Sequence, residues 1–120
     1  MLNVVNALRK ALKDALDVPV YVNIPDERPS VFVVVNRGGG VWENPLIDRA
    51  GINVYAYAET EGAAYELMER ACEAIRTLPF TGGFCRMEME NIRSDYDLKA
   101  RVPRWYSSWT ITNYQPLTKE

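Results

Sequence analysis

The sequence predicts an α+β fold, a two-layer sandwich in which two helices pack on one face of a mixed or antiparallel β-sheet. Apolar residues recur at the three- and four-residue spacing of amphipathic helices in residues 3–16 and 60–78. Four longer stretches show the alternation or the β-branched content of strands: residues 31–36, 48–58, 84–92 and 104–114. With 120 residues the chain has the length of one domain, which we place at residues 1–120.

The N-terminal elements have recognisable limits. Asn3 is a residue type that caps helix N-termini, and Pro19 limits the first helix at its other end. A short strand is expected at residues 20–23, directly after that proline. The polar segment 24–29 contains two prolines and is expected to be a loop. Residues 31–36 form the most β-branched run and are expected to be a central strand.

A run of three glycines separates this strand from the next one. We interpret residues 37–45 as a long hairpin connection, because consecutive glycines adopt backbone angles that other residues cannot. A phosphate-binding loop would need its glycines to open a helix, but here Pro45 and a strand follow. An exposed Trp42 suits a contact with a partner, since aromatic side chains dominate binding hot spots. The candidate interface residues in this segment are Arg37, Gly38, Gly39, Gly40 and Trp42.

The second half repeats the pattern of helix followed by strands. Thr60 is expected to cap the second helix, with Glu61 near its positive end. The polar segment 91–103 is expected to connect the last two strands. Because the strand after a crossover helix can lie parallel to the strand before it, the sheet is expected to be mixed or antiparallel.

Large apolar side chains fall on both faces of the predicted strands. In residues 48–58, Ile52 and Val54 point to one side, whereas Tyr55 and Tyr57 point to the other. A sheet that is covered by helices on one side should be polar on its far side. We therefore expect the far face to meet another protein, although the tyrosines could instead lie under a loop of the same chain. The candidates on this face are Phe32, Tyr55, Tyr57 and Tyr106.

Composition argues against several function classes. The chain has no histidine, which removes the commonest general base, the Ser-His and Cys-His nucleophile pairs and most zinc sites. We expect no enzymatic activity, no catalytic residue, no metal and no cofactor. A net charge of -2 gives no long-range attraction to nucleic acid. No apolar stretch approaches the roughly 20 residues needed to cross a membrane.

Two pairs of acidic residues could either bind a ligand or simply face solvent. Asp95 and Asp97 are two of the oxygen ligands that a cation would need, but the glycine of a calcium loop is missing, and we interpret them as a solvated turn. Glu88 and Glu90 fall on one strand face about 7 Å apart. With Arg86 beside them, a solvated or interfacial row of charges is the preferred interpretation.

In three places the sequence resembles the tail-terminator proteins of long-tailed bacteriophages, the minor tail protein U-like family. The first is the amphipathic N-terminal helix that leads to a proline-bounded strand. The second is DRAGINVYAYA at residues 48–58, followed by TEGAAYELM at residues 60–68. The third is SDYD at residues 94–97, which leads to VPRWY at residues 102–106 and a final strand. Together these patterns span nearly the whole chain.

The resemblance implies a subunit of a six-membered ring on the head-proximal end of the tail tube, where the ring stops tube growth and offers a surface to the neck. The implied partners are further copies of the chain, the tail tube protein and a neck or head-completion protein, with DNA only as passing cargo. The implied location is the virion tail, and the host cytoplasm during assembly. No catalytic residue is carried over. As a hypothesis, Glu88 and Glu90 face the central channel.

Three alternatives remain open. Another neck or tail-completion protein of the head–tail interface would share every feature used above. A ligand-binding α+β regulatory module would be a dimer with an apolar pocket. A histidine-free enzyme is the third.

Overall fold

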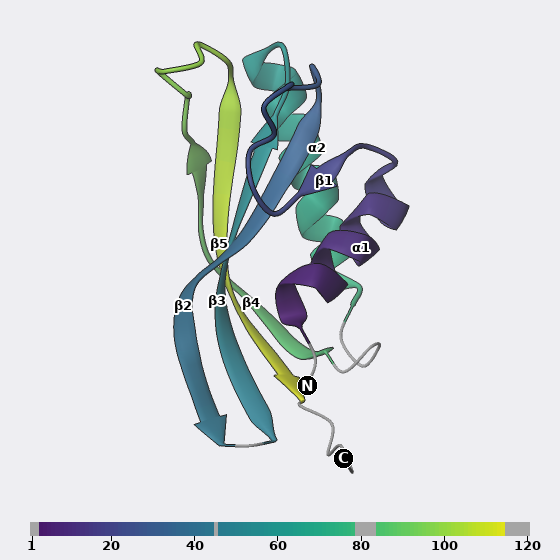
Figure 1. The fold of residues 1–120 in the computed structure, drawn as a ribbon, viewed down its shortest axis with the longest axis vertical. Coiled ribbons are helices and arrows are strands. Elements are labelled where there is room, and N and C mark those ends of the chain that lie inside the picture. Colours follow the sequence, from purple (N-terminus) through teal and green to yellow (C-terminus); the bar gives the residue numbers. More distant parts are fainter. Residues whose placement is uncertain (1–2, 45, 79–83, 115–120) are drawn as a thin grey trace.

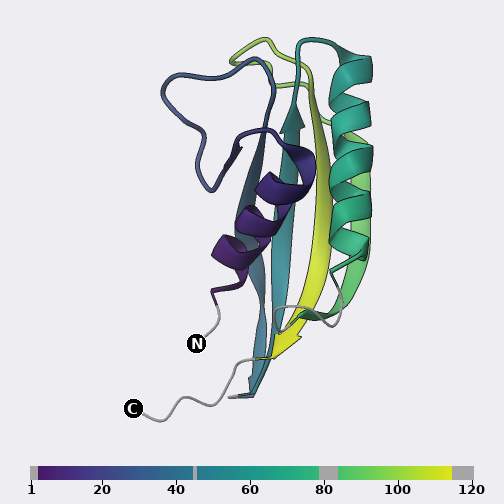
Figure 2. The same ribbon diagram turned by 90° about the vertical axis from the view of Figure 1, so that its right-hand side faces the viewer.

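One five-stranded sheet and two helices form the structure, a computed structural model that describes residues 3–44, 46–78 and 84–114 (Figure 1). The elements in chain order are α1 (Val4–Leu16), β1 (Val20–Tyr21), β2 (Phe32–Asn44), β3 (Ile47–Tyr57), α2 (Glu61–Arg76), β4 (Phe84–Ser94) and β5 (Arg104–Tyr114). The strand order is β1-β2-β3-β5-β4, with β1 parallel to β2 and the other pairs antiparallel. Both helices lie on the same face of the sheet (Figure 2). The predicted fold class is confirmed.

The helix ends agree with the predicted capping residues. The Asn6 N–H donates to Asn3 Oδ1 at 3.2 Å, and the Ala63 N–H donates to Thr60 Oγ1 at 3.1 Å. These side chains satisfy backbone donors that have no partner within the helix. The two helices are joined by Arg70, whose Nη2 donates to the carbonyl oxygen of Leu16 at 2.8 Å.

The main core lies between the helix layer and the near face of the sheet. The apolar stripes of both helices are buried there, as their spacing predicts. Trp109 and Ile111 of β5 complete the core, and Trp109 Nε1 donates to Ser107 Oγ at 2.9 Å. The residues that form the centre of this core include Leu8, Leu12, Val33, Val35, Ile52, Val54, Met68, Ala71, Ile75, Trp109 and Ile111.

Residues 37–44 are part of β2 instead of the predicted connection. Two register shifts against β3, between Arg37 and Gly39 and between Trp42 and Asn44, mark bulges that absorb extra residues without ending the strand. The β2–β3 hairpin therefore extends beyond the ends of both helices (Figure 2). The prediction was wrong here because glycines that weaken a regular strand fit a bulged one.

The last connection is also shorter than predicted. β4 runs to Ser94, so the connection covers residues 95–103, which contain a single bridge between Asp97 and Val102. β4 forms one edge of the sheet and contains two bulges, between Phe84 and Arg86 and between Met89 and Asn91.

Candidate interaction surfaces

The far face of the sheet, opposite the helices, is divided into two halves with different surroundings. We call the half beside segments 22–31 and 95–103 the proximal half, and the half that continues into the β2–β3 hairpin the distal half. In the proximal half Phe32 and Tyr57 are each only 2% exposed, and their rings stack 4.4 Å apart. Tyr21 and Val102 pack against them. The expectation that Phe32 and Tyr57 form an exposed patch is therefore wrong, because loops of the same chain cover them.

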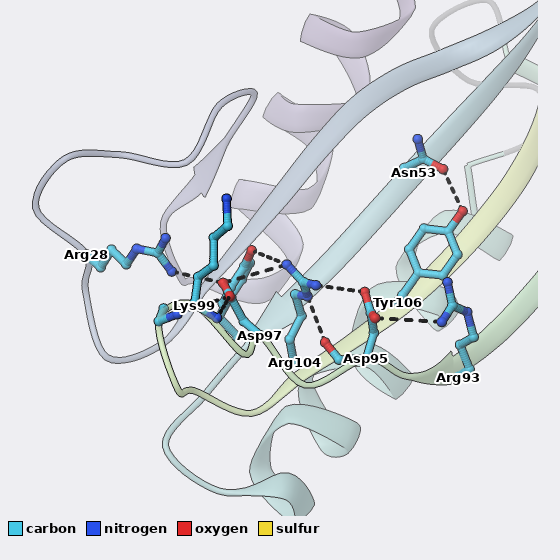
Figure 3. Close-up of polar contacts among 10 residues, drawn as sticks. Arg28, Asn53, Arg93, Asp95, Asp97, Lys99, Arg104 and Tyr106 are labelled. Atoms are coloured by element: carbon cyan, nitrogen blue, oxygen red, sulfur yellow. Dashed lines mark hydrogen bonds and ion pairs between the residues drawn. The ribbon is translucent and has the colours of Figure 1, made fainter.

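A row of alternating charges closes the proximal half (Figure 3). Asp97 pairs with Arg28 at 3.3 Å and with Arg104 at 3.7 Å. Asp95 pairs with Arg104 at 3.0 Å and with Arg93 at 3.6 Å. Asp97 is only 8% exposed, so the interpretation as a solvated turn is wrong for this residue, whereas Tyr96 and Leu98 of the same turn are exposed. The two aspartates hold three arginines over the tyrosines of the sheet.

Asp97 also fixes the backbone of its own turn. Its Oδ1 accepts hydrogen bonds from the N–H groups of Lys99 and Ala100, both at 3.2 Å. Burial acts to raise the pKa of the Asp97 carboxyl, but the Ala100 N–H and the guanidinium groups of Arg28 and Arg104 outweigh it, so this pKa lies below its ordinary value. The carboxylate is the charged centre around which the covering loops are arranged.

The arginines of this row lie over aromatic rings. Arg104 Cζ is 5.3 Å from the ring centre of Tyr55 and 5.6 Å from that of Tyr57, and Arg93 Cζ is 5.0 Å from that of Tyr106. Such cation–π contacts stabilise both groups. Arg104 Nη1 also donates to the Tyr57 hydroxyl at 3.1 Å. Tyr55 and Tyr106 remain half-buried, so they are the two far-face candidates that a partner can still reach.

The sequence contained part of the signal for this network. Arg93, Asp95, Asp97 and Arg104 alternate in sign within one short segment, which is the pattern of an ion-pair row. Arg28 lies 69 residues before its partner Asp97, and no local pattern reveals that contact.

The distal half is polar, and its side chains form rows that run across the paired strands. Asn53 stands in the first row, where its Nδ2 donates to Asn36 Oδ1 at 3.1 Å. Its Oδ1 accepts from the Tyr106 hydroxyl at 2.8 Å (Figure 3). The next row contains Gly39 and Gly51, which are directly paired across β2 and β3. Two neighbouring positions without side chains, between rows that have them and beside Thr110 of β5, leave a depression.

This depression is a hollow of about 210 Å³, which we call the glycine trough. It is defined by Gly38–Gly40, Gly51, Asn53, Glu90, Ser108 and Thr110. Its sides carry an amide, two hydroxyls and a carboxylate, all of which can accept hydrogen bonds. The predicted glycine segment therefore borders a surface feature that also includes β4 and β5.

The opposite face of the hairpin carries Trp42 and an ion pair. Trp42 is 48% exposed and pairs across the strands with Asp48, which is buried on the helix side of the sheet. Arg37 binds Asp48 with two hydrogen bonds of 2.7 and 2.8 Å, and its Nε donates to the Gly39 carbonyl at 2.8 Å. The hydrogen bond to Asp48 raises the pKa of Arg37. Arg37 thus braces the hairpin from within, and Trp42 is free to make contacts.

Glu88 and Glu90 lie on the edge strand β4. Glu88 pairs with Arg86 at 3.3 Å, as the predicted row of charges implies. Glu90 is exposed at the bulge between Met89 and Asn91, which interrupts the alternation of side chains, and it borders the glycine trough.

Other surface hollows mix charged and apolar groups. One of about 610 Å³ lies between α1 and β1 and includes Arg9, Lys13 and Asp17. Another of about 390 Å³ lies beside Tyr55 and Arg104 in the proximal half. The first also has Val18, Pro19 and Val20 in its lining, and the second is lined by Asn23, Asn36 and Asp95 beside its aromatic residues.

Two further features of the described residues concern metals and membranes. In residues 3–44, 46–78 and 84–114, no group of three or more His, Cys, Asp or Glu side chains is arranged to hold a metal ion. Within the same ranges, neither helix combines the length and the apolar character of a membrane span.

Comparison with known proteins gives a match at the level of structure. No family model and no curated protein sequence matches the chain. A chain of the solved structure "Virion of native gene transfer agent (GTA) particle" superposes with a TM-score of 0.50 over 92% of each chain, at 14% sequence identity. At this identity the match concerns the fold. The arrangement of two helices on one face of a mixed sheet is therefore shared with a chain of that particle.

Proposed function

We propose that this protein is a structural component of a phage-type virion, a tail terminator that forms a ring on the tail tube and joins it to the head or neck. The observation that carries the proposal is the fold match, which extends over 92% of both chains, to a chain found in a virion particle. The resemblance of residues 48–68 and 94–106 to tail terminators points the same way. The proposed partners are further copies in a ring of six, the tail tube protein and a neck protein.

The distribution of exposed apolar side chains supports this role. A ring subunit needs contacts to two neighbours and to the layers above and below it. The molecule is elongated, with its longest extent 47 Å. The β2–β3 hairpin presents Val41, Trp42 and Leu46 at one end, and the β4–β5 connection presents Tyr96 and Leu98 at the other (Figure 1). Leu98 is 82% exposed on a turn that Asp97 fixes, so its position is set before any partner binds.

Removal of the gene from its virus tests the proposal. Without a terminator, tail tubes are expected to grow to uncontrolled lengths and to lack heads, which electron microscopy of lysates measures. Tubes of normal length that fail to join heads would instead assign the chain to another neck or tail-completion protein, which the fold match favours equally. Normal, joined particles would contradict both roles.

The mass of the purified chain provides a second test. Light scattering after size-exclusion chromatography is expected to show a hexamer. A stable dimer that binds a small molecule would support the regulatory module instead. In an assembled ring, Glu88 and Glu90 are proposed to face the channel through which DNA passes.

A further inference from the structure

We infer that the glycine trough receives the Trp42 side chain of a second copy of this chain, an inference that rests on the proposed ring and names the contact between its subunits. Trp42 is a large aromatic side chain that is 48% exposed, and residues 37–44 around it are exposed as well. Aromatic anchors that fill a pocket on the partner account for much of the energy of protein interfaces.

The glycines keep the floor of the trough free of side chains. Gly40 has a φ of 104°, and a Cβ there would lie 2.2 Å from the Arg49 carbonyl oxygen, so the hairpin itself requires this glycine. Gly51 has no such backbone angle, but its Cβ would lie 3.3 Å from the Gly39 carbonyl carbon and 3.4 Å from the Gly40 nitrogen, so the backbone of β2 approaches it closely. Glycine at both positions therefore serves the hairpin, and the missing side chains leave a depression that a second molecule can enter.

The trough offers partners for both parts of an indole. Above Gly39 an added Cβ would meet no atom within 4 Å, so a flat ring can lie directly on the backbone. The hydroxyls of Ser108 and Thr110 and the carboxylate of Glu90 line the same hollow of about 210 Å³. Each of them can accept a hydrogen bond from an indole N–H, which usually finds a partner when it is buried.

The geometry of the hairpin makes the contact intermolecular. Residues paired across neighbouring strands share a face of the sheet, so Trp42 lies with Asp48 on the helix side, whereas Gly51 lies on the far side with Tyr55. A chain cannot place its own Trp42 into its own trough. The contact joins the helix-side face of one hairpin to the far-side face of the next. The helices end before this part of the hairpin, so they leave both of its faces open (Figure 2). Such a heterologous contact can repeat around a ring.

Sedimentation velocity of the full chain over a concentration series tests the inference. Trp42→Ala is expected to weaken self-association by at least about 30-fold, the effect of losing a hot-spot aromatic. Thr110→Phe is expected to weaken it similarly, because the new ring fills the trough. The matched controls are Ile24→Ala, which removes an exposed apolar side chain far from the hairpin, and Thr112→Phe, which adds a ring on the same face of β5. Both controls are expected to associate like the wild type.

A cross-link gives an independent readout. Oxidation of a mixture of the Glu43→Cys and Ser108→Cys variants, both of which keep Trp42, is expected to link position 43 of one copy to position 108 of another, as identified by mass spectrometry. Oxidised wild-type protein provides the background from Cys72 and Cys85. A strictly monomeric wild-type chain, or association that neither Trp42→Ala nor Thr110→Phe weakens, would overturn the inference.

The inference and the proposed function fail in different ways. A ring that forms without Trp42 removes the trough contact but leaves the tail-terminator role. Association that depends on Trp42 in a chain that is absent from virion tails keeps the trough contact and removes the role.

Discussion

The same strands form both halves of the far face, but one half is covered by loops of the chain and the other is open to solvent. In the proximal half the chain covers its own aromatic residues with two loops and a row of five charged side chains. In the distal half the sheet stays open, and residues 37–44 are exposed. Alternating apolar residues therefore show that a face is covered, but they do not show whether the cover is the same chain or a partner. The location of the loops decides between the two.

The halves should also differ in what their residues stabilise. Proximal side chains support the folded chain. The hairpin that continues the distal half has exposed side chains available for assembly, beside internal contacts such as the Asn36–Asn53 hydrogen bond and the Arg37–Asp48 ion pair. Four substitutions test this contrast.

The largest effect is expected in the covered half. Phe32→Ala should lower the free energy of unfolding by about 3–5 kcal/mol, because it leaves a cavity beside the stacked ring of Tyr57. Urea denaturation followed by circular dichroism measures this change. A loss below about 1 kcal/mol would mean that the loops do not cover Phe32 in solution.

A smaller loss is expected from the backbone of the open half. Gly40→Ala should cost about 2–3 kcal/mol, since it strains a backbone that only glycine adopts easily and brings a Cβ against the Arg49 carbonyl. Hydrogen exchange of the hairpin amides locates the effect, and Gly51→Ala is the control with an ordinary backbone angle. Equal losses in the two variants would contradict the assigned strain.

Asp97→Asn should weaken the cover of the proximal half by about 1.5 kcal/mol, the scale of a buried charge-assisted hydrogen bond. Because the pKa of Asp97 is lower in the folded chain than in the unfolded one, its stabilisation is complete above the unfolded-state value of about 3.9 and is lost as the pH falls through the folded value. Denaturation from pH 7 to pH 2 should therefore show a shallower acid-side loss for the variant. Parallel pH curves would show that Asp97 makes no pH-dependent contribution.

The smallest effect on folding is expected from Trp42→Ala, below about 0.5 kcal/mol, because a substitution at an exposed site removes few contacts within the chain. The denaturation midpoint of the monomer at low concentration measures it. A large loss would show that Trp42 packs against its own chain and would erase the contrast with Phe32.

Local features of the fold were accessible from the sequence, and non-local ones were not. Asn3 and Thr60 identified the helix starts because a cap acts within one turn. The glycine trough could not be predicted from the sequence, because Gly51, Glu90 and Ser108 come from three different strands whose pairing is not local. The glycine run was predicted as a connection because its bulges are visible only when its register against β3 is known. Phe32 and Tyr57 were placed on the correct face, yet the cover depended on a contact between residues 28 and 97.

The irregular outer strand β4 has a consequence for the size of any assembly. Its two bulges and its exposed Arg86, Glu90 and Arg93 break the regular ladder of backbone donors and acceptors that a neighbouring strand would need. Copies of the chain are thereby kept from adding strand to strand into an endless fibre. Further copies must instead bind through side-chain contacts, and the angle of these contacts can bring the last copy back to the first.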